Sequence, residues 1–487
     1  MVYPLLLSLT EENSLYNGFQ EYATFLEKRG LLRRIGVSVS GELEIAAIAQ
    51  RACRLPEGGP ALLFEKISGS EFPIMLNSYG SAERLTWAFS VGKLSQLTER
   101  VVELFKPSLS QGLGIRQFLF GESAELDKYS PRQIKSAVCQ EVSEVHNPSF
   151  SQLPFLRWNA SDSGVSLRRA SLLYIDPTSG KQKMASTGLL IQANRQALLV
   201  EPTGDLAITK PTEAAIIIGE DPSLLAVAHA ALPLEVDGLA LAGFMRRVRY
   251  ETVKGLKVGL DIPSGAEFVL EGILEPHSAN QTETVALSSG YYHQLKGAIG
   301  FQLSAISHRR NPLWVDIISG QPPQEEAQLI RVTERMLLPF VKVVAPEIVD
   351  LNLAPGNARN GIALVSIQKS YPGQAQKVMY ALWGMTRLRE LKYIIVVDTD
   401  CNLHDYATVA WRVCNRVDLS RDLILVNGLL PTTDRLSRLP GMGSKIGIDS
   451  TNKLPGEVEP NQYLSASELP HKLVKLIDEK WASFGID

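Results

Sequence analysis

The pattern of hydrophobic residues changes twice along this chain of 487 residues, and this limits the fold more than any other feature. Residues 17–54 indicate two helices around a short strand, because apolar side chains at helical spacing flank the alternating run LLRRIGVSV. Strand-like runs follow at 61–67 and 73–80, and Ser81 is typical of a helix N-cap. We therefore predict an N-terminal α/β domain over residues 1–105.

The middle of the chain is rich in short β-strand patterns. Runs such as SLLYIDPTSGK and AEFVLEGILEP lie between about Phe155 and Ile317, separated by Asp-Pro and glycine-containing turns. This spacing is typical of a barrel or a sandwich. One helix interrupts the pattern, starting at Asp221. We place this β-rich domain at residues 106–323.

Helices and strands alternate again after Gln324. Long amphipathic runs such as EEAQLIRVTERMLLPFV predict helices, and YIIVVD is a nearly continuous apolar strand. Continuous apolar strands between helices indicate a sheet that is covered on both faces. The predicted C-terminal α/β domain covers residues 324–487, so the fold class is mixed α/β and β.

Composition excludes several classes of protein. A net charge of −3 argues against a dedicated nucleic-acid binder, and 45% hydrophobic residues argue against a disordered chain. The four cysteines lie far apart without a CxxC pair, which excludes a disulfide framework and the usual zinc spacings (Cys53, Cys139, Cys401 and Cys414). This usage fits a reducing cytosol.

No segment has the length and apolarity of a transmembrane helix. The most apolar stretch, 223–245, is interrupted by Pro233, Glu235 and Asp237. We therefore expect a cytoplasmic protein that is not transmembrane.

Three glutamates recur at every fourth position of the strand-like run AEFVLEGILEP. This spacing places Glu267, Glu271 and Glu275 on one face of a strand. Carboxylates gathered inside a barrel would have raised pKa values and could donate protons near neutral pH. The alternative is an acidic outer face in contact with water, and periodicity alone favours this alternative.

Two further clusters have structural interpretations. Asp398, Asp400 and Asp405 follow the apolar strand YIIVVD, where aspartates can bind a cation. Helix capping is the simpler interpretation, because Asp405 directly precedes a helical run. The glycine-rich run GMGSKIG at 441–447 lacks the spacing of a dinucleotide loop, and we interpret it as a structural turn.

A dozen collinear segments of this chain resemble UbiD-type decarboxylases over nearly its whole length. Among them are EYATFLEKRGLLRR, AEFVLEGILEP, AISHRRNPLW, KSYPGQAQKVMYALWG and GMGSKIGIDSTNKLPGE. The resemblance implies an N-terminal α/β domain, a central FMN-binding split β-barrel and a C-terminal α/β domain. It also implies assembly into homo-oligomers through the C-terminal domain.

Members of that family remove carbon dioxide, reversibly, from aromatic or α,β-unsaturated acids, including the prenylated 4-hydroxybenzoate of quinone biosynthesis. The resemblance implies prenylated FMN as cofactor, bound through a divalent metal (manganese or magnesium) and potassium. The cofactor acts as an electron sink while a protein carboxylic acid returns the proton. A small aromatic acid is the implied substrate.

Some residues that the family uses are present. Glu267 and Glu271 fall on the strand that carries the family's catalytic carboxylate, which implies a proton-donor role for them. Lys445, in the GSK of the C-terminal motif, falls near the region of the cofactor phosphate. Lys183 stands where the family has a metal-binding asparagine, and it could neutralise a phosphate in the metal's place.

Other positions of the family's site have lost their functional side chains. Gly188 stands at the arginine that works with the catalytic acid, and Gly204 and Gly238 stand near the histidine and glutamate metal ligands. Leu287 replaces a further acidic residue. We therefore predict no protein metal ligand.

Three hypotheses follow. The first is a carboxy-lyase with altered cofactor anchorage. The second is a catalytically inactive paralogue that acts as a scaffold or regulatory partner, alone or assembled with an active homologue. The third is a barrel that binds ordinary flavin or another nucleotide.

Overall fold

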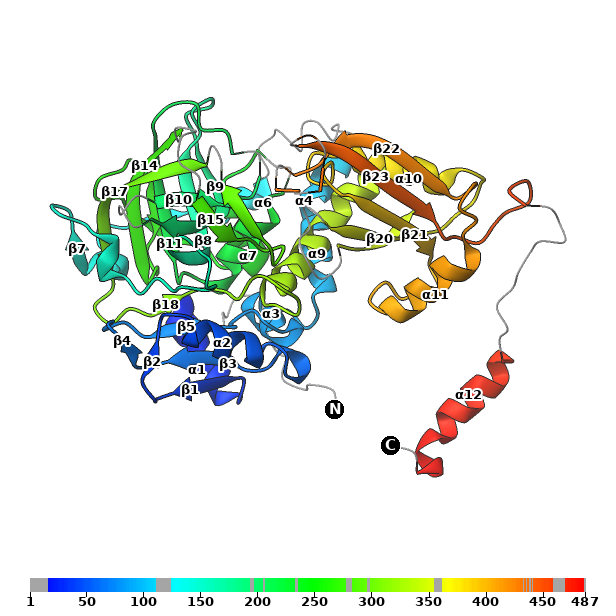
Figure 1. The fold of residues 1–487 in the computed structure, drawn as a ribbon, viewed down its shortest axis with the longest axis horizontal. Coiled ribbons are helices and arrows are strands. Elements are labelled where there is room, and N and C mark those ends of the chain that lie inside the picture. Colours follow the sequence, from blue (N-terminus) through cyan, green and yellow to red (C-terminus); the bar gives the residue numbers. More distant parts are fainter. Residues whose placement is uncertain are drawn as a thin grey trace.

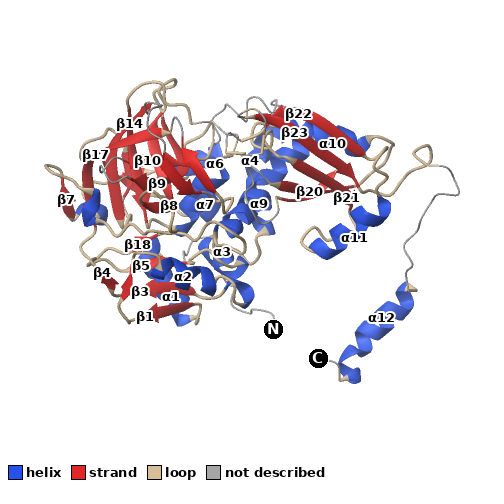
Figure 2. Cartoon of the chain, viewed as in Figure 1, coloured by secondary structure: helices blue, strands red, loops and turns tan. Residues whose placement is uncertain are grey.

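A computed structural model describes residues 16–485, except for 111–123, 193–196, 205, 233–234, 277–282, 296–297, 354–360, 432, 435, 438, 440 and 459–468. Figure 1 shows an N-terminal domain in blue, a β-barrel mainly in green and a C-terminal sheet in yellow and orange. Figure 2 shows that strands dominate the barrel, whereas helices and strands mix in the other two parts. The predicted order of α/β, barrel and α/β is confirmed.

The N-terminal domain has a four-stranded sheet with the strand order β1-β3-β5-β18. Its elements are α1 (Gly18–Lys28), β1 (Leu32–Ile35), α2 (Glu44–Ala52), β3 (Ala61–Phe64), β5 (Ile74–Leu76) and α3 (Ala82–Ala88), with β2 (Val39–Ser40) and β4 (Ile67–Ser68) as a separate pair. Ser81 caps α3 by accepting a hydrogen bond from the Arg84 N–H, as its position in the sequence predicts. The fourth strand, β18 (Trp314–Val315), follows the barrel strands in the sequence and pairs with β5.

The central barrel is a closed ring of six antiparallel strands in the order β10-β9-β8-β11-β14-β17, and β10 pairs with β17 to close it. The strands are β8 (Val165–Ile175), β9 (Gln182–Ile191), β10 (Ala197–Val200), β11 (Thr212–Ile218), β14 (Phe268–Pro276) and β17 (Ile299–His308). β7 (Val142–Glu144) adds to the outer edge of β17. The run AEFVLEGILEP therefore does form a strand, with a bulge after Glu271.

Two short helices pack beside the barrel and matter for the site. They are α7 (Pro222–Ala230), which Asp221 caps, and α8 (Gly238–Arg246), which Asp237 caps. The smaller elements of this region are α6 (Ala124–Asp127), β6 (Arg132–Gln133), β12 (Glu251–Lys254), β13 (Asp261–Pro263), β15 (Glu283–Ala286) and β16 (Tyr292–Leu295). The helix predicted to start at Asp221 is confirmed.

A long helix, α9 (Glu326–Val344), connects the barrel to the C-terminal domain. It packs against α4 (Ser95–Ser110), against α7 on the barrel side and against β19 of the C-terminal sheet. That sheet has the order β19-β20-β21-β23-β22. The elements are β19 (Ile348–Asn352), β20 (Ile362–Ile367), α10 (Gln374–Trp383), β21 (Tyr393–Asp398), α11 (Tyr406–Arg416), β22 (Leu423–Leu429) and β23 (Met442–Asp449).

The glycine-rich run 441–447 is mostly a strand, so its interpretation as a turn is wrong beyond Gly441. Gly443 and Gly447 lie in β23, where close packing excludes a side chain. A Cβ atom would lie 2.6 Å from Leu430 at Gly443 and 2.5 Å from Met379 at Gly447. The glycines therefore serve close packing of the sheet, which local sequence alone does not reveal.

The last helix, α12 (His471–Lys480), stands apart from the rest of the molecule (Figure 1). Within the part of the chain that the structure describes, every helix is too short or too polar to cross a membrane.

Candidate functional site

Glu267 directly precedes β14, and its side chain is completely buried. Its carboxylate accepts hydrogen bonds from Gln20 Nε2 (2.8 Å), the Leu313 N–H (2.8 Å) and Arg309 Nη1 (3.0 Å). Burial raises the pKa of Glu267 to about 6, although these donors oppose the shift. The result is a buried carboxylic acid that exchanges its proton near neutral pH.

A second acid, Glu220, lies beside Glu267 and was not identified from the sequence. Burial, and then the charge of Glu267, raise the pKa of Glu220 to about 8. Its buried Oε2 atom has no hydrogen-bond partner among the described residues. Glu220 also borders a small cavity of about 20 Å³ together with Tyr79 and Arg169, a space large enough for one water molecule.

Gly219 leaves room for the side chain of Glu267 next to the backbone that carries Glu220. Its φ is +68°, and a Cβ atom there would lie 2.5 Å from Glu267 Cγ. Only glycine adopts this backbone conformation without strain and also leaves room for the glutamate. Gly219 and Glu220 lie between β11 and the helix expected from Asp221, and this link places Glu220 beside Glu267.

Glu271 is also buried, at 1% exposure, but it contacts a different part of the protein. Its carboxylate accepts hydrogen bonds from the N–H groups of Leu256 (2.8 Å), Lys257 (2.7 Å) and Val258 (3.2 Å). These residues form the turn between β12 and β13. The interpretation of a water-exposed acidic face is therefore wrong for Glu267 and Glu271 and holds only for Glu275, which is exposed.

Lys183 lies on β9 at a separate cavity of about 410 Å³, beside α7 and α8. Its lining combines apolar side chains such as Met184 and Leu241 with the charged residues Lys181, Glu235 and Asp237. Lys183 Nζ lies 3.0 Å from Asp176 Oδ2 and 3.0 Å from Glu235 Oε2. Although burial opposes it, hydrogen bonds to these two carboxylates raise the pKa of Lys183 above its ordinary value.

Asp176 is held in its charged form. The backbone N–H of Thr178 is the largest influence that lowers the pKa of Asp176, which falls to about 2 with help from Ser179 and Lys183. The ammonium of Lys183 therefore lies between two carboxylates, of which Asp176 remains ionised at neutral pH.

The divalent metal that the family resemblance implies does not fit this cavity. Gly204 and Gly238 offer no side-chain donor, and a Cβ atom at Gly238 would lie 2.6 Å from Met184 Cβ. At Gly188 a Cβ atom would lie 2.8 Å from the Arg168 carbonyl oxygen. Among the described residues, no group of three histidines, cysteines or acids is placed to hold a metal ion.

Lys445 lies in the C-terminal domain and does not line the cavity of Lys183. Its Nζ donates a hydrogen bond to the Arg389 carbonyl oxygen and lies 5.7 Å from the centre of the Trp383 ring. Burial lowers the pKa of Lys445 to about 8. The structure thus places Glu267, Lys183 and Lys445 at three separate locations.

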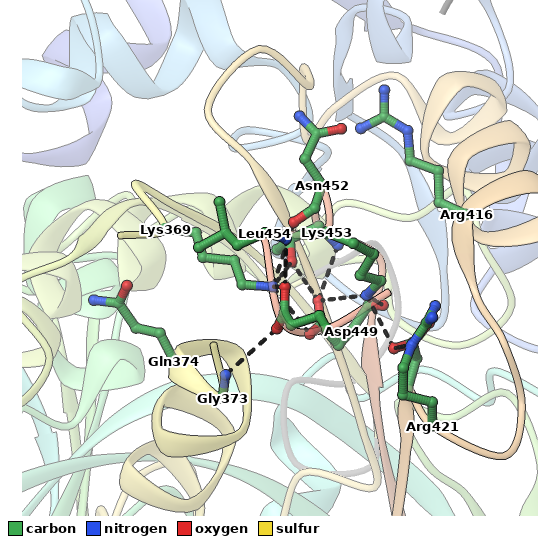
Figure 3. A network of polar contacts seen from close by, with 12 residues as sticks. Lys369, Gly373, Gln374, Arg416, Arg421, Asp449, Asn452, Lys453 and Leu454 are labelled. Atoms are coloured by element: carbon green, nitrogen blue, oxygen red, sulfur yellow. Dashed lines mark hydrogen bonds and ion pairs between the residues drawn. The ribbon is translucent and has the colours of Figure 1, made fainter. Parts of the chain in front are cut away.

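A polar network that sequence reasoning missed joins two segments quoted for the family resemblance (Figure 3). Lys369, from KSYPGQ, has a side chain that is 2% exposed and contacts Glu457 Oε2 at 2.7 Å and Asp449 Oδ2 at 3.6 Å. Lys453 also contacts Asp449, at 3.4 Å. The charged residues in the segments KSYPGQ and GIDSTNKLPGE were the only sequence feature that could have indicated this network.

The aspartates after β21 form structural contacts. Asp405 caps α11 by accepting a hydrogen bond from the Thr408 N–H, which confirms the capping interpretation. Asp400 forms a two-pronged ion pair with Arg412 at 2.7 and 2.8 Å.

Comparisons with known proteins cover almost the whole chain. Three family models match, described as the N-terminal domain, the Rift-related domain and the C-terminal domain of 3-octaprenyl-4-hydroxybenzoate carboxy-lyase, over residues 23–103, 132–322 and 327–450. An uncharacterised protein of Archaeoglobus fulgidus is 31% identical, covering 96% of this chain and 98% of its own length.

Solved structures have the same architecture. The UbiD-class enzyme HmfF from Pelotomaculum thermopropionicum, in complex with FMN, is 26% identical with a TM-score of 0.74, covering 95% of this chain and 100% of that one. The closed form of vanillic acid decarboxylase from Sedimentibacter hydroxybenzoicus is 23% identical with a TM-score of 0.80, covering 98% and 100%. The second likeness concerns the fold alone.

Proposed function

Because this chain belongs to the UbiD family of 3-octaprenyl-4-hydroxybenzoate carboxy-lyases, we propose that it catalyses the reversible, non-oxidative decarboxylation of an aromatic or α,β-unsaturated acid. The observation that carries this proposal is the buried Glu267, whose pKa is raised to about 6. Removal of carbon dioxide leaves a carbon that must gain a proton, and an acid of this pKa supplies one near neutral pH.

The neighbours of Glu267 support this role. Arg309 and Gln20 fix the orientation of its carboxyl group, and Glu220 is a second proton carrier beside it. The cavity beside Glu220 provides a place through which a water molecule could return a proton from solvent. In this proposal Glu267 donates the proton and Glu220 replenishes it. Glu271 holds the turn beside the strand.

The cofactor proposed is a flavin. HmfF is described in complex with FMN and, in an evolved dimeric form, with prFMN. Prenylated FMN would supply an electron sink when bound, and the apolar part of the Lys183 cavity offers a surface to its ring system. In this protein the apolar residues of the lining would hold the ring and exclude water.

The test uses the full-length protein reconstituted with prenylated FMN and a panel of aromatic and α,β-unsaturated acids. We expect release of carbon dioxide, and a loss of about 100-fold or more in Glu267→Gln, the scale of general acid catalysis. Glu275→Gln is the matched control on the same strand and should retain activity. Absence of both cofactor binding and carbon dioxide release across the panel would refute the proposal.

A second candidate is a non-catalytic family member that acts as a scaffold or regulatory partner. A specific observation favours it: the acid and the cavity lie at opposite ends of α7. Glu220 directly precedes Asp221, the cap of this helix, whereas Val227 and Ala231 near its other end line the cavity. This candidate would be favoured if the protein co-purified with an active homologue. The activity of that homologue should then stay unchanged when the Glu267→Gln variant of this protein replaces the wild type in the complex.

For assembly, we propose that the outer edge of the C-terminal sheet pairs with a second copy of the chain. β22 lies at the end of the strand order, and edge strands offer unpaired backbone groups. Exposed apolar side chains gather on this edge and on the segment after it (Leu425, Leu429, Leu436, Leu439 and Met442). Light scattering should show a dimer or larger species for the wild type and a smaller species for Leu425→Glu. A monomeric wild type would refute the pairing.

A further inference from the structure

The ammonium of Lys183 lies between two carboxylates, as a bound cation would. Two carboxylates converge on it, Asp176 from the end of β8 and Glu235 from the segment before α8, each with an oxygen 3.0 Å from Nζ. Acidic oxygens gathered around one point are the ligands that magnesium and manganese prefer. In this protein the ammonium group of Lys183 occupies that position between the carboxylates.

The charges explain why the arrangement is stable. One ammonium between two carboxylates leaves a net charge of −1, whereas the carboxylates alone would repel each other across a half-buried site. A divalent ion could enter only by displacing Lys183, whose side chain is 32% exposed and is anchored through its stem on β9. Asp237, the cap of α8, also lines the cavity, but its Oδ1 accepts the N–H groups of Leu239 and Ala240. Gly238, the next residue, packs directly on Met184.

We infer that Lys183 is a built-in replacement for a metal ion, which keeps this cavity free of divalent cations, and that removing its charge converts Asp176 and Glu235 into a divalent-metal site. The inference concerns binding only and does not depend on the proposed decarboxylation. Gly204 and Gly238 offer no side-chain ligand, and the two acids that pair with Lys183 receive their cation from the chain itself.

The experiment measures Mn²⁺ binding to full-length protein by the electron paramagnetic resonance signal of free Mn²⁺. The wild type should bind no stoichiometric Mn²⁺. Lys183→Gln keeps most of the side chain and its polarity but removes the charge, and it should bind one Mn²⁺ at least about tenfold more tightly than the wild type. The double variant with Glu235→Gln should lose this gain.

Two control variants distinguish the loss of charge at position 183 from a change of side chain there and from a loss of charge elsewhere on the cavity. Lys183→Arg retains the positive charge and should remain without Mn²⁺. Lys181→Gln removes one positive charge from the rim of the same cavity, and it should not gain a site.

Stoichiometric, tight Mn²⁺ binding by the wild type would overturn the inference without any variant. So would a Lys183→Gln protein that folds, as judged by circular dichroism and its melting temperature, yet binds Mn²⁺ no better than Lys181→Gln. Failure of the carboxy-lyase assay would leave both results unchanged, so the two proposals fail independently.

Discussion

Glu271 offers the sharpest test of whether a carboxylate of β14 serves the fold or the chemistry. The family resemblance implies a catalytic role, whereas the structure shows its two oxygens accepting three backbone N–H groups at 2.7–3.2 Å. In Glu271→Gln the amide oxygen retains one or two of these hydrogen bonds, but the NH₂ group faces the remaining donors. We therefore expect a loss of stability as the main effect.

The size of this effect follows from the contacts. A hydrogen bond to a charged acceptor contributes about 1.5–3 kcal/mol, and a buried donor left without an acceptor costs about 1–3 kcal/mol. Losing one or two of the three bonds at a site that is 1% exposed should lower the free energy of unfolding by about 2–4 kcal/mol.

The assay is urea unfolding monitored by intrinsic tryptophan fluorescence. It is combined with hydrogen exchange of the backbone amides of Leu256, Lys257 and Val258. Exchange of these three amides should accelerate in Glu271→Gln and stay unchanged in Glu275→Gln, whose side chain is exposed. A variant that loses less than about 0.5 kcal/mol, or loses activity with its amides still protected, would refute the structural role.

Three further outcomes follow from the contacts described above. Burial raises the pKa of Glu220 to about 8 from an ordinary 4.5, so at intermediate pH the folded protein holds a proton that the unfolded chain releases. The melting temperature should therefore fall as the pH rises from 5 to 8, and it should fall less steeply in Glu220→Gln. Gly219→Ala should lower the melting temperature and alter any pH profile set by Glu267, because its Cβ atom would lie 2.5 Å from Glu267 Cγ; unchanged values would contradict the packing. Lys369→Met removes the ammonium that pairs with Glu457 and leaves Lys453 as the remaining cation beside Asp449, so it should cost about 3–5 kcal/mol. Thermal melting of the full chain measures this loss against the exposed-site variant Lys472→Met, and equal melting temperatures would refute it.

Local sequence patterns determined much of the architecture. The change from helical to alternating spacing of apolar residues predicted the order α/β, barrel, α/β. This works because the spacing of apolar residues indicates which face of a helix or strand is buried. The caps at Ser81 and Asp405 were also predictable, since a cap satisfies N–H groups only three residues away. The resemblance to UbiD-type decarboxylases was likewise visible in the sequence.

Tertiary structure alone decided what the site residues contact. Glu267 accepts a hydrogen bond from Gln20, 247 positions away, and its neighbour Glu220 follows another strand, β11. Lys183 finds Glu235 across a cavity between β9 and the α7–α8 segment. Periodicity shows which way a side chain points, but burial and charge depend on the elements packed against it. The sequence therefore predicted three carboxylates on one strand, and only the packing made one a buried acid, one an anchor for a turn and one an exposed surface charge.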